Sequence, residues 1–465
     1  MISGTLREFA AAFGRPFLQS DAVLDTSFTG VTIDSRQPLP GSIFVAIVGE
    51  NQDGHNFVKA AVAAGSPIVI VNKSRFAEFS ALPETVVVGV DDTLAALQQL
   101  AQSYLRILDP RKVAVTGTNG KTTCKNLIAG VLGAKYRVCA SRGNLNNQFG
   151  VPLSIFEFDR NCEIAVFEFG MSTPGEIKNL VELYDPDVRV ILNIGPAHLE
   201  TMKTIDAIAE AKFELLHNSS ESDWAVLNFD DPNVRSRSYR YRVQKLTFAA
   251  NTEGDVRAER VFMNGSGHGH LVYAGQEIIL PVLGVHHVTN CLAAIAVARI
   301  FDVPFAAVKE RIEKFVPAGN RMTAEDFHGL TIINDAYNSN PVSAKGALDT
   351  IAAMQVRGRR VVVFGDMLEL GEQAPEFHAD LGRKLAESRV DRLILLGEFA
   401  QLVRDAAIRR GMDADAIAIA ATHDDAVQML SAYLRSGDLL LLKASRGLKL
   451  EIVEQGLKAT WGRSN

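Results

Sequence analysis

The chain has 465 residues, of which 47% are hydrophobic and 22% charged, with a formal net charge of -6. At about 150 residues per domain this length predicts three domains, and the composition is typical of globular proteins with large apolar cores. The acidic balance excludes the broad basic face that nucleic-acid binding requires, so we expect no nucleic-acid partner. Net charge says little about a single cleft, however, and a pocket for anionic substrates stays compatible with it.

The cysteines and the first residues indicate a cytoplasmic protein. Four cysteines are too widely spaced for a metal knuckle or a disulfide framework, and we expect reduced thiols at Cys124, Cys139, Cys162 and Cys291. The first eight residues carry charge where a signal peptide would need an apolar run.

One uncharged stretch has the length of a membrane span. Residues from Ile278 to Ala298 include no Asp, Glu, Lys or Arg. Pro281 and Gly284 interrupt this stretch, which predicts a strand, a turn and a buried helix instead. We therefore expect no membrane partner.

Residues 1–90 are predicted to form a small α/β unit. The runs 41–47 and 67–71 have the apolar character of strands, and residues 57–64 have helical spacing.

Residues 91–316 are predicted to form a larger central unit that opens with an amphipathic helix over 91–108. Short apolar runs alternate with helical stretches, and a helix around 291–301 closes the unit. The alternation predicts a doubly wound, mainly parallel sheet with strands at 112–116, 164–169 and 188–194.

Residues 317–465 repeat the alternation of strand and helix, which predicts a Rossmann-like unit with strands at 331–334, 360–364, 392–396 and 438–443. The expected fold class is therefore α/β with three domains.

A glycine-rich loop follows the strand at 112–116 and is the strongest signal in the chain. Backbone N–H groups of such a loop surround phosphates, and the N-terminus of the following helix adds a favourable field. Lys121 would neutralise the β- and γ-phosphates, and the Thr122 hydroxyl would reach magnesium. We expect ATP binding by Gly117, Thr118, Asn119, Gly120, Lys121, Thr122 and Thr123.

The complete nucleotide-loop pattern would place glycine where this chain has Val115, so a chance connection between a strand and a helix is the alternative. The loop alone does not separate a kinase from a ligase. Its shorter form, Thr-Gly-Thr-Asn-Gly-Lys-Thr-Thr at 116–123, resembles the Mur ligase family and the folylpolyglutamate synthetases of the same superfamily.

Two side chains at strand ends are candidates for metal binding. Glu168 ends the apolar run at 164–169, where a carboxylate faces the ligand crevice and suits magnesium; the alternative is a solvated edge residue. His198 follows the next strand, although a lone histidine is more often a structural hydrogen-bonding residue. The resemblance implies that both bind magnesium and that His198 also serves catalysis.

Lys212 lies on a predicted helix for which Thr204 is a suitable N-cap. The apolar stripe of that helix holds Ile205, Ala209, Lys212 and Leu216, and a charged, unpaired lysine is costly there. Its side chain could instead extend to solvent. The resemblance implies a catalytic lysine that is carbamylated and supplies an anionic oxygen to a second magnesium ion.

Three further residues are candidates for contacts with ATP. The segment 284–294 resembles the family segment whose asparagine contacts adenine, here Asn290, with a helix N-cap as the alternative. Arg321 matches the family arginine that contacts phosphate. Asp335, after the strand at 331–334, suits ribose hydroxyls, with a turn-forming role as the alternative.

The run Asn-Asp-Ala-Tyr-Asn-Ser-Asn-Pro at 334–341 resembles the branch of the family that adds D-alanyl-D-alanine, and Asn338 within it is a candidate substrate contact. The segments 364–371 and 442–451 resemble the same branch. Ser339 and Ala444 depart from the pattern, and Ala444, which replaces glycine, puts the local backbone geometry in question.

Candidate contacts to the sugar nucleotide lie earlier in the chain. Ser35 and Arg36 offer a hydroxyl and a fork of donors for a uracil edge or a diphosphate. Asn144 and Asn147 lie in a segment that resembles the muramoyl side of the family's cleft. In both places the alternative is a simple turn.

The motifs keep the family's order over nearly the whole chain. The resemblance implies an ATP- and magnesium-dependent ligase that joins D-alanyl-D-alanine to UDP-N-acetylmuramoyl-tripeptide through an acyl phosphate, acting as a cytoplasmic monomer. It implies a UDP-binding, an ATP-binding and a Rossmann-like domain. The alternatives are the ligase for the third amino acid, whose Asp-Asn-Pro-Arg is absent here, a folylpolyglutamate synthetase, a P-loop kinase or regulatory NTPase, and a binding-only relative.

Overall fold

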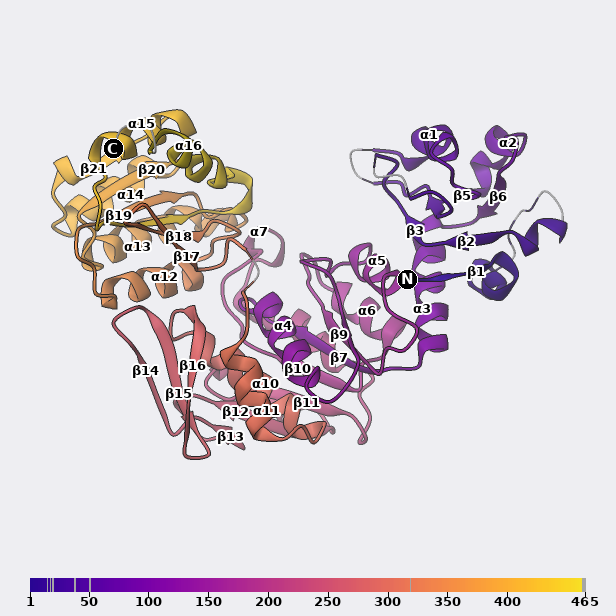
Figure 1. Ribbon diagram of the computed structural model, residues 1–465, viewed down its shortest axis with the longest axis horizontal. Coiled ribbons are helices and arrows are strands. Elements are labelled where there is room, and N and C mark those ends of the chain that lie inside the picture. Colours follow the sequence, from indigo (N-terminus) through magenta and orange to yellow (C-terminus); the bar gives the residue numbers. More distant parts are fainter. Residues whose placement is uncertain are drawn as a thin grey trace.

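The computed structural model describes residues 1–14, 16, 18, 21–36, 39–49, 52–317 and 319–461. Along the chain, three units follow one another, each built around its own parallel or mixed sheet (Figure 1). The predicted α/β class with three units is confirmed.

The N-terminal unit contains a four-stranded parallel sheet of order β3-β4-β5-β6. The predicted strands at 41–47 and 67–71 are present in shorter or shifted form, whereas β6 was not predicted. The elements are β1 (Ser3–Thr5), β2 (Ser27–Thr29), β3 (Val31–Thr32), β4 (Ile43–Val45), α1 (Val58–Ala63), β5 (Ile68–Asn72), α2 (Phe76–Phe79) and β6 (Val86–Val90).

The central sheet has seven parallel strands in the order β13-β12-β11-β10-β7-β9-β8. Its strands are β7 (Arg111–Thr116), β8 (Val138–Ala140), β9 (Ile164–Glu168), β10 (Val188–Ile191), β11 (Trp224–Asn228), β12 (Gln244–Ala249) and β13 (Val256–Arg257). The chain passes from β7 out to β8, back to β9 and then to β10 on the other side of β7. Ligands bind at such a reversal of strand order.

Helices cover both faces of this sheet, as the doubly wound prediction requires. Ala114 of β7 packs into one core, and Val113 and Val115 pack into the other. The helices of the unit are α3 (Thr93–Leu108), α4 (Lys121–Leu132), α5 (Gly150–Phe156), α6 (Glu176–Tyr184), α7 (Leu199–Met202), α8 (Ile205–Phe213), α9 (Pro232–Ser238), α10 (His287–Ile300) and α11 (Phe305–Glu313).

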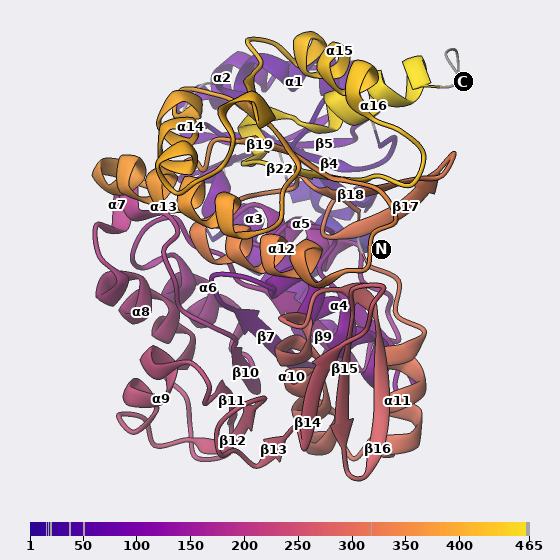
Figure 2. The ribbon, with the colours of Figure 1, turned by 90° about the vertical axis from the view of Figure 1, so that its left-hand side faces the viewer.

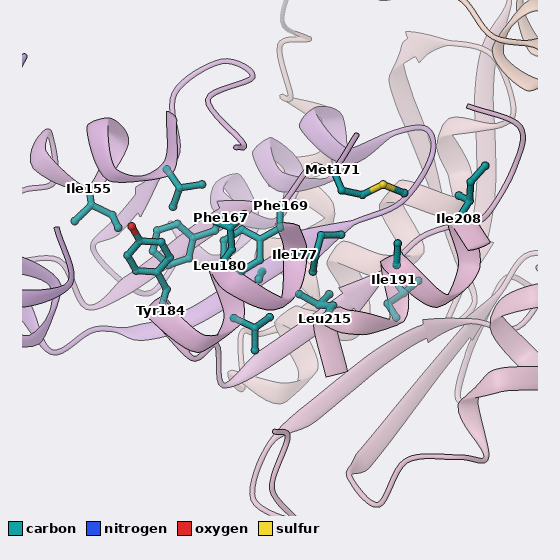
Figure 3. Packing of buried hydrophobic residues seen from close by; sticks show 14 of the residues in the cluster. Ile155, Phe167, Phe169, Met171, Ile177, Leu180, Tyr184, Ile191, Ile208 and Leu215 are labelled. Atoms are coloured by element: carbon teal, nitrogen blue, oxygen red, sulfur yellow. The ribbon is translucent and has the colours of Figure 1, made fainter. Parts of the chain in front are cut away.

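A row of aromatic rings packs along one face of β9 (Figure 3). Phe167 stacks between Phe169 and Tyr184 of α6, with ring centroids 5.9 and 6.1 Å apart. All three rings are buried. Because interiors are close-packed and resist displacement, this row holds the end of β9, where Glu168 lies, in a defined position.

A three-stranded antiparallel sheet of β14 (Arg260–Met263), β15 (His268–Tyr273) and β16 (Gln276–Leu283) extends the central unit, and β14 and β15 were not predicted. Gly284, with φ of +98°, then turns the chain into α10, so the strand, turn and helix expected over 278–298 are confirmed. No helix within the described ranges is long and apolar enough to cross a membrane.

The C-terminal sheet has the order β17-β18-β22-β19-β20-β21 and is parallel except for β17. All four predicted strands are present, whereas the edge strands β17 and β21 were not predicted. The elements are β17 (Thr323–Phe327), β18 (Leu330–Asp335), α12 (Pro341–Ala353), β19 (Arg360–Gly365), α13 (Ala374–Glu387), β20 (Arg392–Leu396), α14 (Ala400–Arg409), β21 (Ile417–Ile419), α15 (His423–Tyr433), β22 (Leu439–Lys443) and α16 (Glu451–Trp461).

The N- and C-terminal units lie on different sides of the central unit in the view of Figure 1, and α12 faces the central unit (Figure 2). The C-terminal unit contacts the loop that follows β7, where Asn340 bonds to Asn119.

Candidate active site at the end of the central sheet

The glycine-rich loop joins β7 to α4, as predicted. Gly120 has a φ of +82°, and a Cβ there would collide with the side chain of Asn290 from α10. The Lys121 ammonium folds back over the loop and donates to the carbonyl oxygens of Gly117 and Thr118, at 2.8 and 3.3 Å. The loop thus has the shape of a phosphate cradle with its lysine at the centre.

A residue that was not predicted fastens this loop to β10. Asn193 accepts the Asn119 N–H at 2.8 Å and donates its own amide N–H to the Asn119 carbonyl at 3.0 Å. Thr118 exchanges two hydrogen bonds with the backbone of Gly195 nearby. Asn193 lies two residues after the end of β10, within the apolar run that was predicted as a strand over 188–194.

Glu168 is the hub of a hydrogen-bond network. The Thr122 hydroxyl donates to Glu168 Oε2 at 2.7 Å, and the Asn146 amide donates to Oε1 at 2.8 Å. The Glu168 N–H donates to the Ser141 hydroxyl at 3.1 Å. The carboxylate is 2% exposed, so these partners, rather than water, orient it. The solvated-edge alternative is therefore wrong.

Three lysines surround this network. Lys121 and Lys125 lie one turn apart on α4, and Lys212 is buried on α8, which Thr204 caps as predicted. Burial, with a smaller contribution from the Lys121 charge, holds the pKa of Lys212 well below its usual value. Lys212 thus does not extend to solvent, and an amine with a depressed pKa is a better nucleophile at neutral pH. The predicted stripe ends before Leu216, which falls in a following 3₁₀ turn.

His198 lies at the start of α7 with a left-handed backbone, φ +53°. Its Nδ1 is 2.6 Å from Glu369 Oε2 of the C-terminal unit. The His198 hydrogen bond lowers the pKa of Glu369. This pairing leaves Nε2 as the ring nitrogen that can face a ligand. Among the described residues, no cluster of three or more His, Cys, Asp or Glu side chains forms a ready metal cage.

The C-terminal unit contacts the loop directly at two points. Arg321 stacks on the Tyr337 ring at 3.7 Å and donates to the Thr122 hydroxyl at 3.1 Å. Asn340, the N-cap of α12, exchanges two side-chain hydrogen bonds with Asn119, at 2.7 and 3.2 Å. Arg321 thus lies beside the glycine-rich loop, and its contact with ATP phosphate stays a prediction.

Asp335 lies at the end of β18, and its carboxylate is held on both oxygens. Lys443, its register partner on β22 and fully buried, donates to Oδ2 at 2.5 Å and to the Asn338 carbonyl at 3.2 Å. The Met322 N–H donates to Oδ1 at 3.2 Å. The Asn338 side chain is exposed and accepts the Ser339 N–H. Lys443 was quoted within a motif but not predicted as a site residue.

Asn290 is buried in the first turn of α10 and is not its N-cap, because the helix begins at His287 after an N-cap at His286. The N-cap alternative is therefore wrong. Its amide lies 3.2 Å from His287 Nδ1 and packs on Gly120 of the loop.

The structure does not gather the sugar-nucleotide candidates at the loop. Arg36 pairs with its neighbour Asp34 through two bonds of 2.9 Å, and Ser35 lies in the same turn of the N-terminal unit. The Asn147 side chain accepts the N–H groups of Phe149 and Gly150 in the turn that leads into α5. In that segment Asn146, and not Asn144 or Asn147, reaches Glu168.

The sequence matches three family models, which together cover most of the chain. They are "Mur ligase family, catalytic domain" over residues 27–105, "Mur ligase middle domain" over 115–298 and "Mur ligase, glutamate ligase domain" over 320–446.

Relatives and solved structures agree with these models. UDP-N-acetylmuramoyl-tripeptide--D-alanyl-D-alanine ligase of Bacillus subtilis is 36% identical over 93% of each chain, and that of Escherichia coli is 30% identical over 87% of this chain and 88% of its own. MurF from Acinetobacter baumannii has a TM-score of 0.87 at 28% identity over 99% of each chain. MurF ligase from Thermotoga maritima, solved in complex with ADP, has a TM-score of 0.81 at 27% identity over 94% of this chain and 99% of its own. The chain belongs to the Mur ligase family.

Proposed function

We propose that this protein joins the amine of D-alanyl-D-alanine to the terminal carboxylate of UDP-N-acetylmuramoyl-tripeptide and consumes ATP in doing so. The full-length relatives carry that activity in their names. The observation that carries the proposal is the network Thr122–Glu168–Asn146 with Arg321 reaching over it, because it places the phosphate loop, an acidic hub and the C-terminal unit at one point.

The positive charge around Glu168 favours the binding of several anionic groups at the same time. Lys121, Lys125, Lys212 and Arg321 lie around a single hydrogen-bonded carboxylate, Glu168. A phosphoryl transfer to a carboxylate needs such positive charge, since both reactants are anionic. A binding-only relative would not require it.

The residues present fit a magnesium ion. The Thr122 hydroxyl and the Glu168 carboxylate are hard oxygen donors 2.7 Å apart. When bound there, magnesium would neutralise charge on the transferring phosphoryl group. A second ion would need the His198 ring and an oxygen donor on Lys212.

Lys212 is suited to provide that oxygen as a carbamate. Its depressed pKa leaves more of the neutral amine, whose nitrogen attacks the carbon of carbon dioxide and then loses a proton. Carbamylation would also remove a buried positive charge that lies in the field of Lys121.

In the proposed reaction the tripeptide carboxylate attacks the γ-phosphorus of ATP, and ADP leaves. The dipeptide amine then attacks the acyl carbon and loses a proton, and phosphate leaves. Lys121 and Arg321 would hold the phosphoryl oxygens, and Asn290 the adenine. Asp335, braced by Lys443, would hold the ribose. Closure of the C-terminal unit would exclude water from the acyl phosphate.

We propose the divisions 1–90, 91–316 and 317–465 for the UDP-binding, ATP-binding and Rossmann-like domains. Ser35, Arg36, Asn144, Asn147 and Asn338 remain our candidates for contacts with the UDP-linked substrate or the dipeptide. We further propose that the enzyme acts as a monomer in the cytoplasm, where both substrates and ATP would be present.

Phosphate release from ATP by the purified protein tests the function. We expect release only when UDP-muramoyl tripeptide and D-alanyl-D-alanine are both present, with a UDP-muramoyl pentapeptide as the product in mass spectrometry. Turnover with ATP alone would instead support a regulatory NTPase. Turnover only when these substrates are replaced by a UDP-muramoyl dipeptide and a single amino acid would support the ligase for the third residue.

A further inference from the structure

Lys125 is a buried cation of the site to which the proposed reaction assigns no contact with ATP or substrate. It lies on α4 one turn after Lys121 and is 1% exposed. Among the described residues, no carboxylate comes within ion-pair distance of its ammonium. Such a group is costly to bury unless its hydrogen bonds are satisfied by fixed partners.

Those partners are two carbonyl oxygens of one loop. Lys125 Nζ donates to the Ser141 carbonyl through a short hydrogen bond and to the Gly143 carbonyl at 3.0 Å. This loop connects β8 to α5 and carries Asn146. One side chain thus ties the helix of the phosphate loop to the segment that follows β8.

The same loop orients Glu168 from two sides. The Ser141 hydroxyl accepts the Glu168 N–H, and the Asn146 amide donates to the Glu168 carboxylate. The Gly170 N–H donates to the Asn146 carbonyl at 2.8 Å, which fixes the loop against the end of β9. The position of Glu168 therefore depends on where Lys125 holds the loop.

We propose that Lys125 is a positioning residue of the ligase site, which anchors the segment 141–147 so that Asn146 orients Glu168 and the segment presents its face to the UDP-linked substrate. Lys125 would act through Asn146, without contact to ATP. This inference rests on the proposed function. It makes Lys125 the residue that connects the phosphate loop to the segment facing the UDP-linked substrate.

Lys125→Met keeps the length of the side chain and removes its charge and donors. We expect kcat/KM for UDP-muramoyl tripeptide to fall about 10- to 100-fold, the range typical of residues that orient a metal ligand. The KM for ATP should stay unchanged, since the loop at 117–123 is untouched. Amide hydrogen exchange of residues 141–148 should become faster, a direct readout of the lost anchor.

Lys135→Met is the matched control. Lys135 follows the same helix and also donates to two carbonyl oxygens, those of Phe301 and Asp302, at 3.2 and 3.0 Å. It lies away from Glu168, so its replacement should leave kcat/KM and exchange at 141–148 as in the parent protein.

A double-mutant cycle with Asn146→Ala separates positioning from general destabilisation. If Lys125 acts through Asn146, the double variant should lose little more kcat/KM than the more damaged single variant. Losses that simply multiply, or a Lys125→Met enzyme that behaves like the Lys135→Met control, would overturn the proposal. If the parent protein makes no pentapeptide, the proposed function fails, and hydrogen exchange at 141–148 still tests the anchor separately.

Discussion

The central and C-terminal units both carry buried charged side chains at the ends of parallel strands, but the balance of charge differs between them. At the end of the central sheet, the cationic side chains outnumber the hydrogen-bonded carboxylate, Glu168. At the end of the C-terminal sheet, Asp335 and Lys443 face each other across neighbouring strands and neutralise each other. The excess of positive charge at the end of the central sheet favours an anionic ligand there. At the end of the C-terminal sheet, the ion pair leaves no such excess and holds the two strand ends together.

The largest expected effect comes from the unbalanced edge. Lys121→Ala removes a cation from the phosphate cradle, and we expect phosphate release to fall about 10²- to 10³-fold. Binding of the UDP-linked substrate, measured by calorimetry, should be retained because its candidate contacts lie elsewhere. Equal loss of both would show that the two sites are not separate.

Changes to the Asp335–Lys443 pair should mainly alter the free energy of unfolding. Asp335→Ala leaves the Lys443 charge buried without its partner, and we expect a loss of about 3 kcal/mol in the free energy of unfolding. Lys443→Met should cost less, because Asp335 keeps the Met322 N–H and part of its solvent contact. Urea unfolding of the ligand-free protein measures both. The double variant should be more stable than Asp335→Ala alone, and additive losses would argue against a coupled pair.

The pH dependence of stability tests the unbalanced edge in a second way. The pKa of Lys212 is depressed in the folded protein, so the unfolded chain binds the proton more tightly. Its contribution to stability therefore rises with pH up to the ordinary lysine pKa of about 10.4. In buffer free of metal and bicarbonate, Lys212→Met should be more stable than the parent near neutral pH, and the gap should narrow as pH increases. A constant gap would mean that Lys212 is protonated in the fold.

The smallest effect concerns the contact between the two edges. Asn340→Ala removes the cap of α12 and both bonds to Asn119, and we expect about 1 kcal/mol of destabilisation with a raised KM for ATP. Thr422→Ala removes the comparable cap of α15 and should cost stability without changing the KM. If both variants behave alike, the Asn119–Asn340 contact has no part in nucleotide binding.

Motifs at strand ends were predictable because a short apolar run and the polar residue after it are both local features. Glu168 and Lys121 were found this way, whereas Arg321 was found through the family resemblance, and the structure brings all three together. Asn146 was missed in favour of Asn144 and Asn147, since neighbouring asparagines look alike until the loop's hydrogen bonds decide which one turns inward.

Contacts between units could not be predicted from local patterns. Glu369 meets His198 only because the C-terminal unit packs beside α7, and Lys443 meets Asp335 only through the order of strands in its sheet. The strands β14 and β15 were missed because their alternation of small, polar and apolar residues is weaker than the continuous apolar runs of the buried parallel strands.

The absence of a side chain at Gly120 limits which substitutions the loop before α4 and the helix α10 can accept. The amide of Asn290 fills the volume that a methyl group at position 120 would occupy, so these two positions share one space. A Gly120→Ala enzyme would have to separate α4 from α10 or expel the Asn290 amide, and either shift would open the cradle. A second change that shortens residue 290 would relieve this collision but not the strain of an alanine at a φ of +82°, so the loop keeps its shape only with glycine at position 120.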